Sequence, residues 1–282
     1  MSCEVKVIAA SRRRGGNVIL WSLQLRYWRA IHGELMTHRV FSRNAGSSRA
    51  TPVKKVLAQV WNDPAGPIHW GANQAGMQAR AQLVGWRLAA AGGLWRTAGK
   101  VMCGFAWGMM KLGLHKQVAN RLLEPWQYIN VLVSSTEWDN FFALRAHPDA
   151  QPEFEELARE IRHKMSLTIP QNLSVGQWHL PYIRSIERLS QPLLTNIKVS
   201  AARCARISIE PFDGDGSVLK EIARHDLLVG SVPIHASPTE HQAQVLGDDS
   251  WVKNFRGFSQ YRCQVENGEL AQKLTESMEP AP

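Results

Sequence analysis

Two polar segments that lie far apart in the chain set the main constraint on its fold. Residues 38–49 run His-Arg-Val-Phe-Ser-Arg-Asn-Ala-Gly-Ser-Ser-Arg, and residues 235–241 run His-Ala-Ser-Pro-Thr-Glu-His. The first segment combines three arginines with hydroxyl and amide side chains and has almost no apolar content. Because arginine presents a rigid fork of donors to anionic oxygens, this composition favours a pocket for a phosphate and a planar heterocycle. We expect the fold to bring both segments to one nucleotide site.

The composition limits the class of protein. The chain has 282 residues, of which 44% are hydrophobic, enough for a substantial core. It has no run of about 18 uncharged apolar residues, so no membrane span is expected, and its first residues lack the pattern of a secretory signal. Its four cysteines are widely spaced without a Cys-x-x-Cys pair. This spacing argues against a zinc module or a disulfide framework and fits a reducing cytoplasm, which for a phage-encoded chain is that of the host.

The pattern of apolar residues predicts an α+β fold, with an antiparallel sheet and long helices, in a single domain spanning 1–282. Strands are expected at 18–25, after the turn Gly15-Gly16-Asn17, and at 129–134. Helices are expected at 27–37, 52–61, 73–112 with a break near Gly92-Gly93, 115–123, 137–165 with a break at Pro148, and 217–228. Residues 101–114 are apolar enough to be core or subunit interface. Residues 170–192 are expected to be a connection, and 266–282 a flexible tail.

The two histidines of the second segment do not predict a metal site. His235 and His241 are six residues apart, which is the wrong spacing for two ligands on one helical face. Pro238 fits a turn into a helix, where Ser237 or Thr239 caps the helix and backbone N–H groups face an anion. An ordinary helix start is the alternative.

Nucleophilic catalysis is weakly supported. Ser47 lacks the Gly-x-Ser-x-Gly elbow of serine hydrolases. Arg203 and Arg206 flank Cys204, and their charge would lower the pKa of its thiol, but a cysteine among small residues is more often packed than catalytic.

Taken together, these residues resemble the flavin-dependent thymidylate synthase family. That family's motif is Arg-His-Arg, seven further residues, Ser, and an Arg two places later, and here Thr37-His38-Arg39 is followed by Ser47 and Arg49 at the same spacing. Four other elements are similar to family motifs: Arg121 four residues before Pro125, Asn140 to Arg145 with Ala150-Gln151 after it, residues 199–207, and residues 235–241. The resemblance covers most of 18–165 and 195–245.

The chain departs from the family pattern in order and in detail. In the family, the elements similar to 199–207 and 235–241 come before the Arg-His-Arg motif, so this chain resembles a permuted or rearranged member, of phage type. Thr37 replaces the leading Arg, and Ala45 replaces a Glu. Ser134-Ser135-Thr136 stands where an Asn-x-Arg pair contacts flavin, and Glu34 stands where a Gln helps to hold the base.

The resemblance implies reductive methylation of dUMP to dTMP in a homotetramer with shared active sites. Methylenetetrahydrofolate would supply the carbon. FAD that has been reduced by NADPH would supply the hydride. It implies that Arg145, with Ser47 beside the base, is catalytic, and that flavin is held by Thr37, His38, Arg39, Asn140, His235 and Ser237. It implies that dUMP is held by Glu34, Asn44, Ser47, Ser48, Arg49, Arg121 and Arg145, with Arg49 and Arg121 on the phosphate.

Three other functions remain open. Glu34 suggests a related reaction, hydroxymethylation of dUMP or a one-carbon transfer to dCMP, as the first alternative. The net charge of +9 and the eleven tryptophans suggest a nucleic-acid-binding module as the second, although the basic residues are dispersed and nucleic acid is the less favoured partner. Thr37 and Ala45 suggest an inactive homologue as the third.

Overall fold

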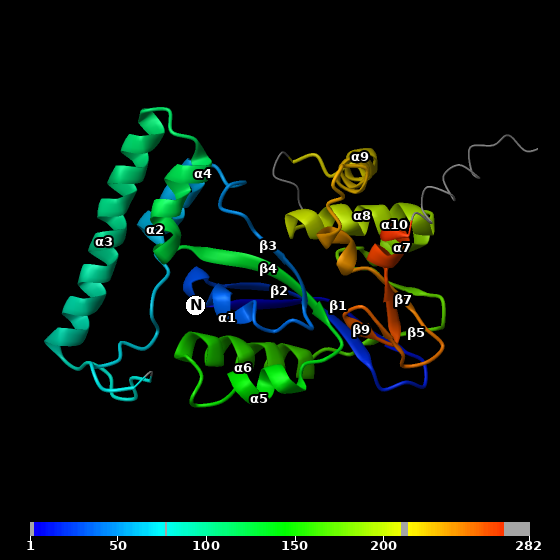
Figure 1. Cartoon of the computed structure of the whole chain (residues 1–282), viewed down its shortest axis with the longest axis horizontal. Helices are drawn as coiled ribbons and strands as arrows, with labels where there is room; N and C mark the ends of the chain where they lie inside the picture. Colours follow the sequence, from blue (N-terminus) through cyan, green and yellow to red (C-terminus); the bar gives the residue numbers. More distant parts are fainter. Residues whose placement is uncertain (1–2, 77, 210–213, 268–282) are drawn as a thin grey trace, which may run out of the picture.

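A five-stranded sheet organises the chain (Figure 1). The computed structural model describes residues 3–76, 78–209 and 214–267. The strand order is β3-β4-β2-β1-β5, with every pair antiparallel except β1 and β5. The strands are β1 (Glu4–Arg13), β2 (Ile19–Trp28), β3 (Ser42–Ala45), β4 (Tyr128–Ser135) and β5 (Gln171–Leu173). The predicted α+β class and antiparallel sheet are confirmed.

The two faces of the sheet carry different chemistry because side chains alternate along each strand. On β2 and β4, Leu23, Leu25, Val131 and Val133 lie in one large apolar core. Their neighbours Ser22 and Ser134 are partners in the β2–β4 register, so both hydroxyls point to the opposite face.

Helices α5 (Asp139–Arg145) and α6 (Pro152–Ser166) cover the apolar face, below the sheet in Figure 1. The break predicted at Pro148 is confirmed, and it separates these two helices. Phe141 and Phe154 are almost fully buried and pack with Phe41 and Trp138 beneath the strands. This aromatic layer fixes both helices to the sheet.

The C-terminal half covers the other face. Helix α8 (Leu193–Arg206) is buried along most of its length, and Cys204 and Ile207 pack on Leu132 of β4. The remaining elements there are β6 (Trp178–His179), α7 (Ser185–Ser190), α9 (Val218–Val229), η3 (Ser237–Glu240), β7 (Ala243–Val245), β8 (Trp251–Val252), β9 (Phe255–Arg256), β10 (Phe258–Gln260) and α10 (Tyr261–Glu266). Residues 170–192, predicted as a connection, therefore contain two short strands and a helix.

A separate group of helices packs around tryptophans at the left of Figure 1. Its elements are α2 (Val53–Asn62), α3 (Trp86–Lys111), α4 (Lys116–Ala119) and η2 (Asn120–Trp126). Trp95 lies 5.4 Å from Trp126 and 5.9 Å from Trp28, ring centre to ring centre. Trp28, Trp95 and Trp126 donate indole hydrogen bonds to backbone carbonyls. These three tryptophans therefore serve packing.

Two helix predictions were wrong in extent. Residues 27–37 complete β2 and then form only η1 (Arg29–Ile31) and α1 (His32–Leu35). The segment before residue 86 is a loop with a Gly71–Gln82 bridge. Helix α3 begins after Gly85, because the φ of 59° at Gly85 is incompatible with a right-handed helix.

The predicted break near Gly92-Gly93 does not occur, and α3 is continuous. Glycine weakens a helix by about 1 kcal/mol relative to alanine, but tertiary packing offsets this cost. A Cβ at Gly99 would lie 3.0 Å from the Trp126 ring, so the small residue permits the close contact. Nearly all of the predicted tail, 268–282, lies outside the described residues. Among the described helices, none is both long and apolar enough to cross a bilayer.

A buried chain of hydrogen bonds joins the sheet to the C-terminal half. Ser134 Oγ lies 2.9 Å from His241 Nδ1 and 2.5 Å from Ser22 Oγ, and His179 lies 2.8 Å from both Ser22 Oγ and Ser11 Oγ. All five side chains are at most 2% exposed. Burial lowers the pKa of His179 and of His241 to about 3, so both imidazoles are neutral in the folded protein.

We expect these two histidines to make the fold acid-sensitive. Their ordinary pKa of 6.5 applies in the unfolded chain, which takes up protons first as the pH falls, so stability present above pH 6.5 is lost toward pH 3. From pH 6.5 to pH 5 the loss is roughly 2 kcal/mol per imidazole. Urea unfolding at both pH values measures it. His179→Gln should lower this slope, whereas exposed His163→Gln should retain it; equal slopes in all three proteins would contradict the assignment.

Candidate functional site

Arg145 is the centre of the candidate site. It ends α5, and its guanidinium is held by three residues of the segment that links β2 to β3. Nη1 donates to Glu34 Oε2 at 2.5 Å, Nε donates to His38 Nε2 at 3.1 Å, and Nη2 lies 3.5 Å from Thr37 Oγ1. The guanidinium also lies 4.7 Å from the centre of the Phe154 ring. Since a guanidinium has five N–H donors, two remain without a partner among the described residues.

His38 is a neutral support for Arg145. Its ring is 7% exposed and lies between Phe41 and Phe154, with the edge of Phe141 against it. Burial, followed by the charge of Arg145 and then that of Arg43, lowers the pKa of His38 to about 4. Because Arg145 is only a donor, Nε2 accepts and the proton of the neutral ring is on Nδ1. Arg43 also donates to the carbonyls of Leu35, Met36 and His38, which fixes this turn.

Glu34 and Arg145 open onto a cavity of about 1030 Å³. Trp28 forms one wall, and the segment from Leu144 to Glu153 forms another. The loop before α3 contributes His69 and Arg80, and Ile68 N–H is tied to Glu153 at 2.9 Å. The cavity is therefore bounded by a charged pair, an indole ring and a loop rich in polar groups.

A second cluster gathers around Glu124 of η2. Ser48 Oγ donates to Glu124 Oε1 at 2.9 Å, and Arg29 and Arg121 lie 3.1 and 3.6 Å from the same oxygen. Asn120 Nδ2 donates to the carbonyls of Ser48 and Thr51. Ser48 and Arg121 therefore meet at the Glu124 carboxylate, and neither they nor Ser47 and Arg49 line the cavity at Arg145.

The C-terminal polar segment lies beside β3. Gln260 Nε2 donates to both Ser42 Oγ and the carbonyl of Glu240 at 2.8 Å, and His241 bonds to Ser134 in the neighbouring strand. These contacts are on the face opposite His38. Arg43 lies between the two regions, since the Glu240 carboxylate raises its pKa against the lowering effect of burial. Asn44 Nδ2 is engaged with the carbonyl of Cys204 at 3.1 Å.

The predicted residues thus fall into three groups. Glu34, Thr37 and His38 come together around Arg145, and Ser48 and Arg121 meet at Glu124, with Ser47 and Arg49 in the turn on either side of Ser48. The third group, Arg39, Asn140, His235 and Ser237, is exposed and is not gathered into one pocket within a single chain. Cys204, weighed as a thiol of lowered pKa, has the opposite shift, because complete burial raises its pKa. Its flanking arginines pair instead with Glu187 and Glu221.

Sequence reasoning missed Trp28, His69 and Arg80 in the cavity wall. Trp28 ends a strand and gave no local signal. The other two lie in the loop that was predicted to be partly helical, and a long irregular segment is itself a sign of a functional loop.

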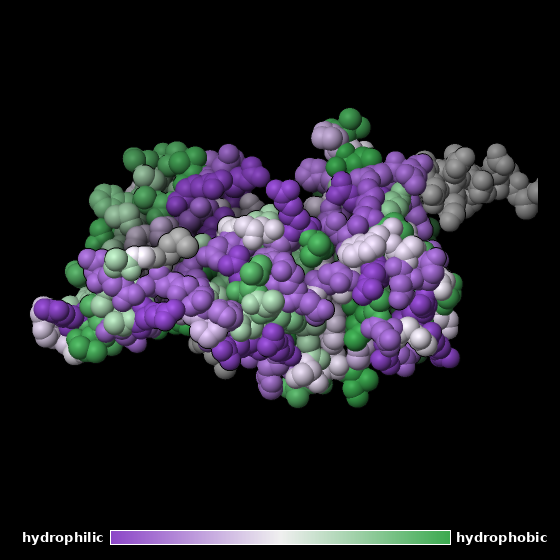
Figure 2. Space-filling view, turned by 60° about the horizontal axis from the view of Figure 1, so that its bottom comes forward, coloured by the Kyte–Doolittle hydropathy of each residue, from purple (hydrophilic) through white to green (hydrophobic). Residues whose placement is uncertain are grey.

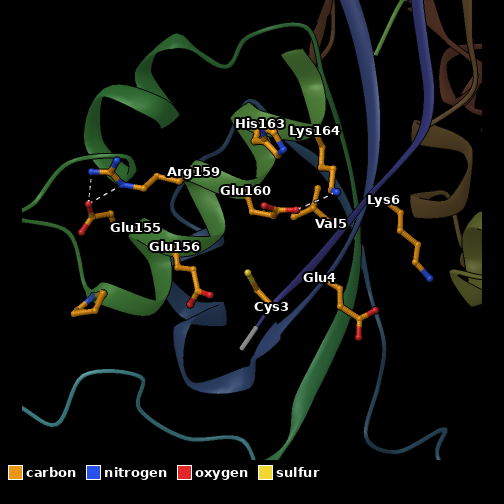
Figure 3. Close-up of a pocket in the computed structure, with 11 residues that line it drawn as sticks. Cys3, Glu4, Val5, Lys6, Glu155, Glu156, Arg159, Glu160, His163 and Lys164 are labelled. Carbon is orange, nitrogen blue, oxygen red and sulfur yellow. Dashed lines mark hydrogen bonds and ion pairs between the residues drawn. The ribbon is translucent and has the colours of Figure 1, made fainter. Parts of the chain in front are cut away.

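A second cavity, of about 740 Å³, lies between the start of β1 and α6 (Figure 3). Its charged side chains pair with one another, Arg159 with Glu155 at 2.6 Å and Lys164 with Glu160 at 3.3 Å. None of the predicted site residues lines it. The predicted residues Glu34 and Arg145 line only the larger of these two cavities.

Comparisons with known proteins give similar structures only. No protein-family model matches the chain, and no curated protein matches it. The UMP/dUMP methylase PolB from Streptomyces cacaoi, bound with 5-Br UMP, is 14% identical over 58% of this chain and 88% of its own, with a TM-score of 0.45. The flavin-dependent thymidylate synthase ThyX from Helicobacter pylori, complexed with FAD and dUMP, is 14% identical over 52% and 67%, with a TM-score of 0.35. At these values the likeness carries no argument about activity.

The environment of His38 can be tested directly. We expect the His38 imidazole to stay neutral from pH 8 to pH 5, because its pKa is about 4. Arg145→Met should raise that pKa by removing the positive charge, but not to the ordinary value, since burial remains the larger cause. Titration of histidine-labelled protein by NMR measures both values. Arg159→Met, on the exposed side of α6, is the control. A His38 that titrates near 6.5 in the unmodified protein would contradict this geometry.

Proposed function

We propose that this chain is an enzyme that methylates C5 of a pyrimidine nucleotide, dUMP, to give dTMP. One observation carries the proposal: Arg145 is held rigidly at the wall of a large cavity, with two N–H groups left to donate. The carbonyl edge of uracil offers acceptors to such a donor. Donation to a carbonyl oxygen stabilises the negative charge of the enolate form of the ring, whose C5 is the nucleophile toward a one-carbon unit.

The supports of Arg145 give it its orientation. Glu34 neutralises its charge, and His38, held neutral by burial, accepts from Nε without adding a competing charge. Trp28 supplies an apolar surface in the same cavity, against which a planar base can lie. In this proposal methylenetetrahydrofolate is the carbon donor and NADPH the reductant.

The residues for FAD do not form a flavin pocket in one chain. His38 is buried and engaged, while Arg39, Asn140, His235 and Ser237 are exposed and dispersed. These four side chains are cationic or polar, with two on each side of β3. They could bind a dinucleotide together only if a second chain brings complementary surfaces to them. We therefore propose that FAD binds between subunits of a homotetramer, and we derive no reaction step through it.

The phosphate of dUMP is proposed to bind at the Glu124 cluster. Replacing Arg49 or Arg121 by Ala should weaken dUMP binding by roughly 1.5–3 kcal/mol, the scale of a hydrogen bond to a charged group. Calorimetric titration with dUMP measures the loss, and deoxyuridine, which lacks the phosphate, should bind all variants equally. Lys55→Ala, on the neighbouring helix α2, is the matched control. Unchanged dUMP affinity in both arginine variants would show that the phosphate lies elsewhere.

Glu34 supports a second candidate function, one-carbon transfer to dCMP or hydroxymethylation. Its carboxylate lies beside Arg145 and only accepts hydrogen bonds, so the pair presents an acceptor next to a donor. The exocyclic amine and N3 of cytosine offer the complementary donor and acceptor.

A product assay distinguishes these functions. Purified protein with FAD, NADPH and methylenetetrahydrofolate is expected to convert dUMP to dTMP, with visible flavin absorbance retained after gel filtration. Arg145→Met should abolish turnover, and Glu34→Gln should favour dUMP over dCMP relative to the unmodified protein. Mass spectrometry of the nucleotide separates methyl from hydroxymethyl products. No flavin binding at tens of micromolar FAD, together with no turnover of either nucleotide, would refute the proposal.

A further inference from the structure

Helix α3 carries an exposed apolar stripe that the rest of the described chain does not cover. Its large members are Leu94, Val101, Phe105 and the C-cap residue Leu112, which are 72, 50, 58 and 89% exposed. Hydrophobic residues gather at the left of Figure 2, where α3 lies. The opposite side of α3 packs on α2 and η2 through Gly99, Cys103 and Ala106, so the helix has one inner and one outer apolar face. An uncovered apolar face of this length indicates an interaction surface.

The stripe has the spacing of a helix-pairing seam. Together with Ala98 and Gly108, its members follow one another at alternating intervals of four and three residues. This heptad spacing keeps one line of side chains facing a partner helix along the length of the contact. A Cβ built at Gly108 would meet nothing within 4 Å, so a second helix can approach closely there.

The sizes along this seam are the same read in either direction: large, small, large, large, small, large. In an antiparallel pair related by a twofold axis near residue 103, Leu94 therefore faces Leu112, Ala98 faces Gly108, and Val101 faces Phe105. Such self-complementarity is what a symmetric contact between two copies requires. A partner of different sequence would not need it.

The charges of α3 leave the seam apolar. Lys100 lies 5.3 Å from the Trp61 ring centre and Lys111 lies 5.4 Å from that of Trp107, so both cations fold onto aromatic rings of their own chain. Arg96 lies on the inner side, near Gly92. Within the seam itself, from Leu94 to Leu112, no side chain is charged.

We propose that α3 pairs antiparallel with α3 of a second copy of this chain, through the seam formed by Leu94, Ala98, Val101, Phe105, Gly108 and Leu112. The inference rests on α3 alone and does not depend on the proposed reaction. None of the seam residues lines the cavity at Arg145.

Disulfide trapping tests the direction and register of the pair. In the full chain carrying Cys263→Ser, the other cysteines are buried. Ala98→Cys with Gly108→Cys should give a covalent dimer under mild oxidation, because these positions face each other. Ala98→Cys alone should give none, since its copy lies about 15 Å away along the helix axis. Trapping of the single variant as efficiently as the double, or of neither, would overturn the proposal.

Sedimentation of the full chain tests the seam itself. Val101→Glu should halve the assembled mass, and adding Phe105→Lys should restore it, because these positions are opposite each other only in the antiparallel register. Leu219→Glu, at a residue 80% exposed on α9, is the control and should leave the mass unchanged. Far-UV circular dichroism checks that α3 is retained. An unmodified protein that is monomeric at about 100 μM, or a Val101→Glu protein of unchanged mass, refutes the pairing. A monomer that sediments with phosphatidylglycerol vesicles would refute it and assign the stripe to a membrane surface.

Discussion

The hydroxyl pair of Ser22 and Ser134 is the joint between the two halves of this molecule. The two serines face each other across β2 and β4 on the sheet face that the C-terminal half covers. An unpaired hydroxyl buried there would cost on the order of 1–3 kcal/mol. Two histidines from the C-terminal half satisfy this requirement, and one direction of donation serves the whole chain. With the proton of each imidazole on Nδ1, His241 can donate to Ser134, Ser134 to Ser22, Ser22 to His179 Nε2, and His179 to Ser11; the other tautomer of each imidazole, with the hydroxyls turned round, serves the reverse direction. Each imidazole must be neutral and carry one proton in this hydrogen-bond chain, and burial keeps it neutral by lowering its pKa.

The placement of the candidate site follows from that joint. With η3 and α8 fixed to one face, α5 and α6 occupy the other, and the segment between β2 and β3 closes over the end of α5. Arg145 is thereby held among Glu34, Thr37 and His38. The aromatic layer beneath shields the imidazole of His38 from solvent. The same sheet carries Arg43, which fixes the turn before β3 and senses the charge of Glu240 from the C-terminal segment. Arg145 is therefore positioned by the segment between β2 and β3 and by Phe154 of α6.

The departures from the family pattern have local consequences that the geometry makes clear. Thr37 does not bring a second guanidinium to the site, and its hydroxyl lies beside the guanidinium of Arg145 instead. The Glu34 carboxylate pairs with the same guanidinium and neutralises its positive charge, which a glutamine amide would leave uncompensated. Ser134, at the place of a flavin-contacting pair, is fully buried in the hydrogen-bond chain and faces no ligand in one subunit.

The sequence by itself determined the strands at 18–25 and 129–134, the turn at Gly15-Gly16-Asn17 and the helix break at Pro148, because alternation, turn chemistry and proline geometry act over a few residues. The resemblance assigned Glu34, Thr37, His38 and Arg145 to one site, but only the tertiary structure showed that the first three hold the guanidinium of Arg145. Only the tertiary structure decided that α3 runs unbroken through Gly92-Gly93, because the packing of its Trp95 on Trp28, Trp70 and Trp126 outweighs a weak local propensity. It alone decided that Cys204 is inert, since its pKa depends on burial by α8 against the sheet rather than on its neighbours in sequence. The positions of Trp28 and Arg80 in the cavity were likewise decided by distant contacts, for which the local sequence carries no signal.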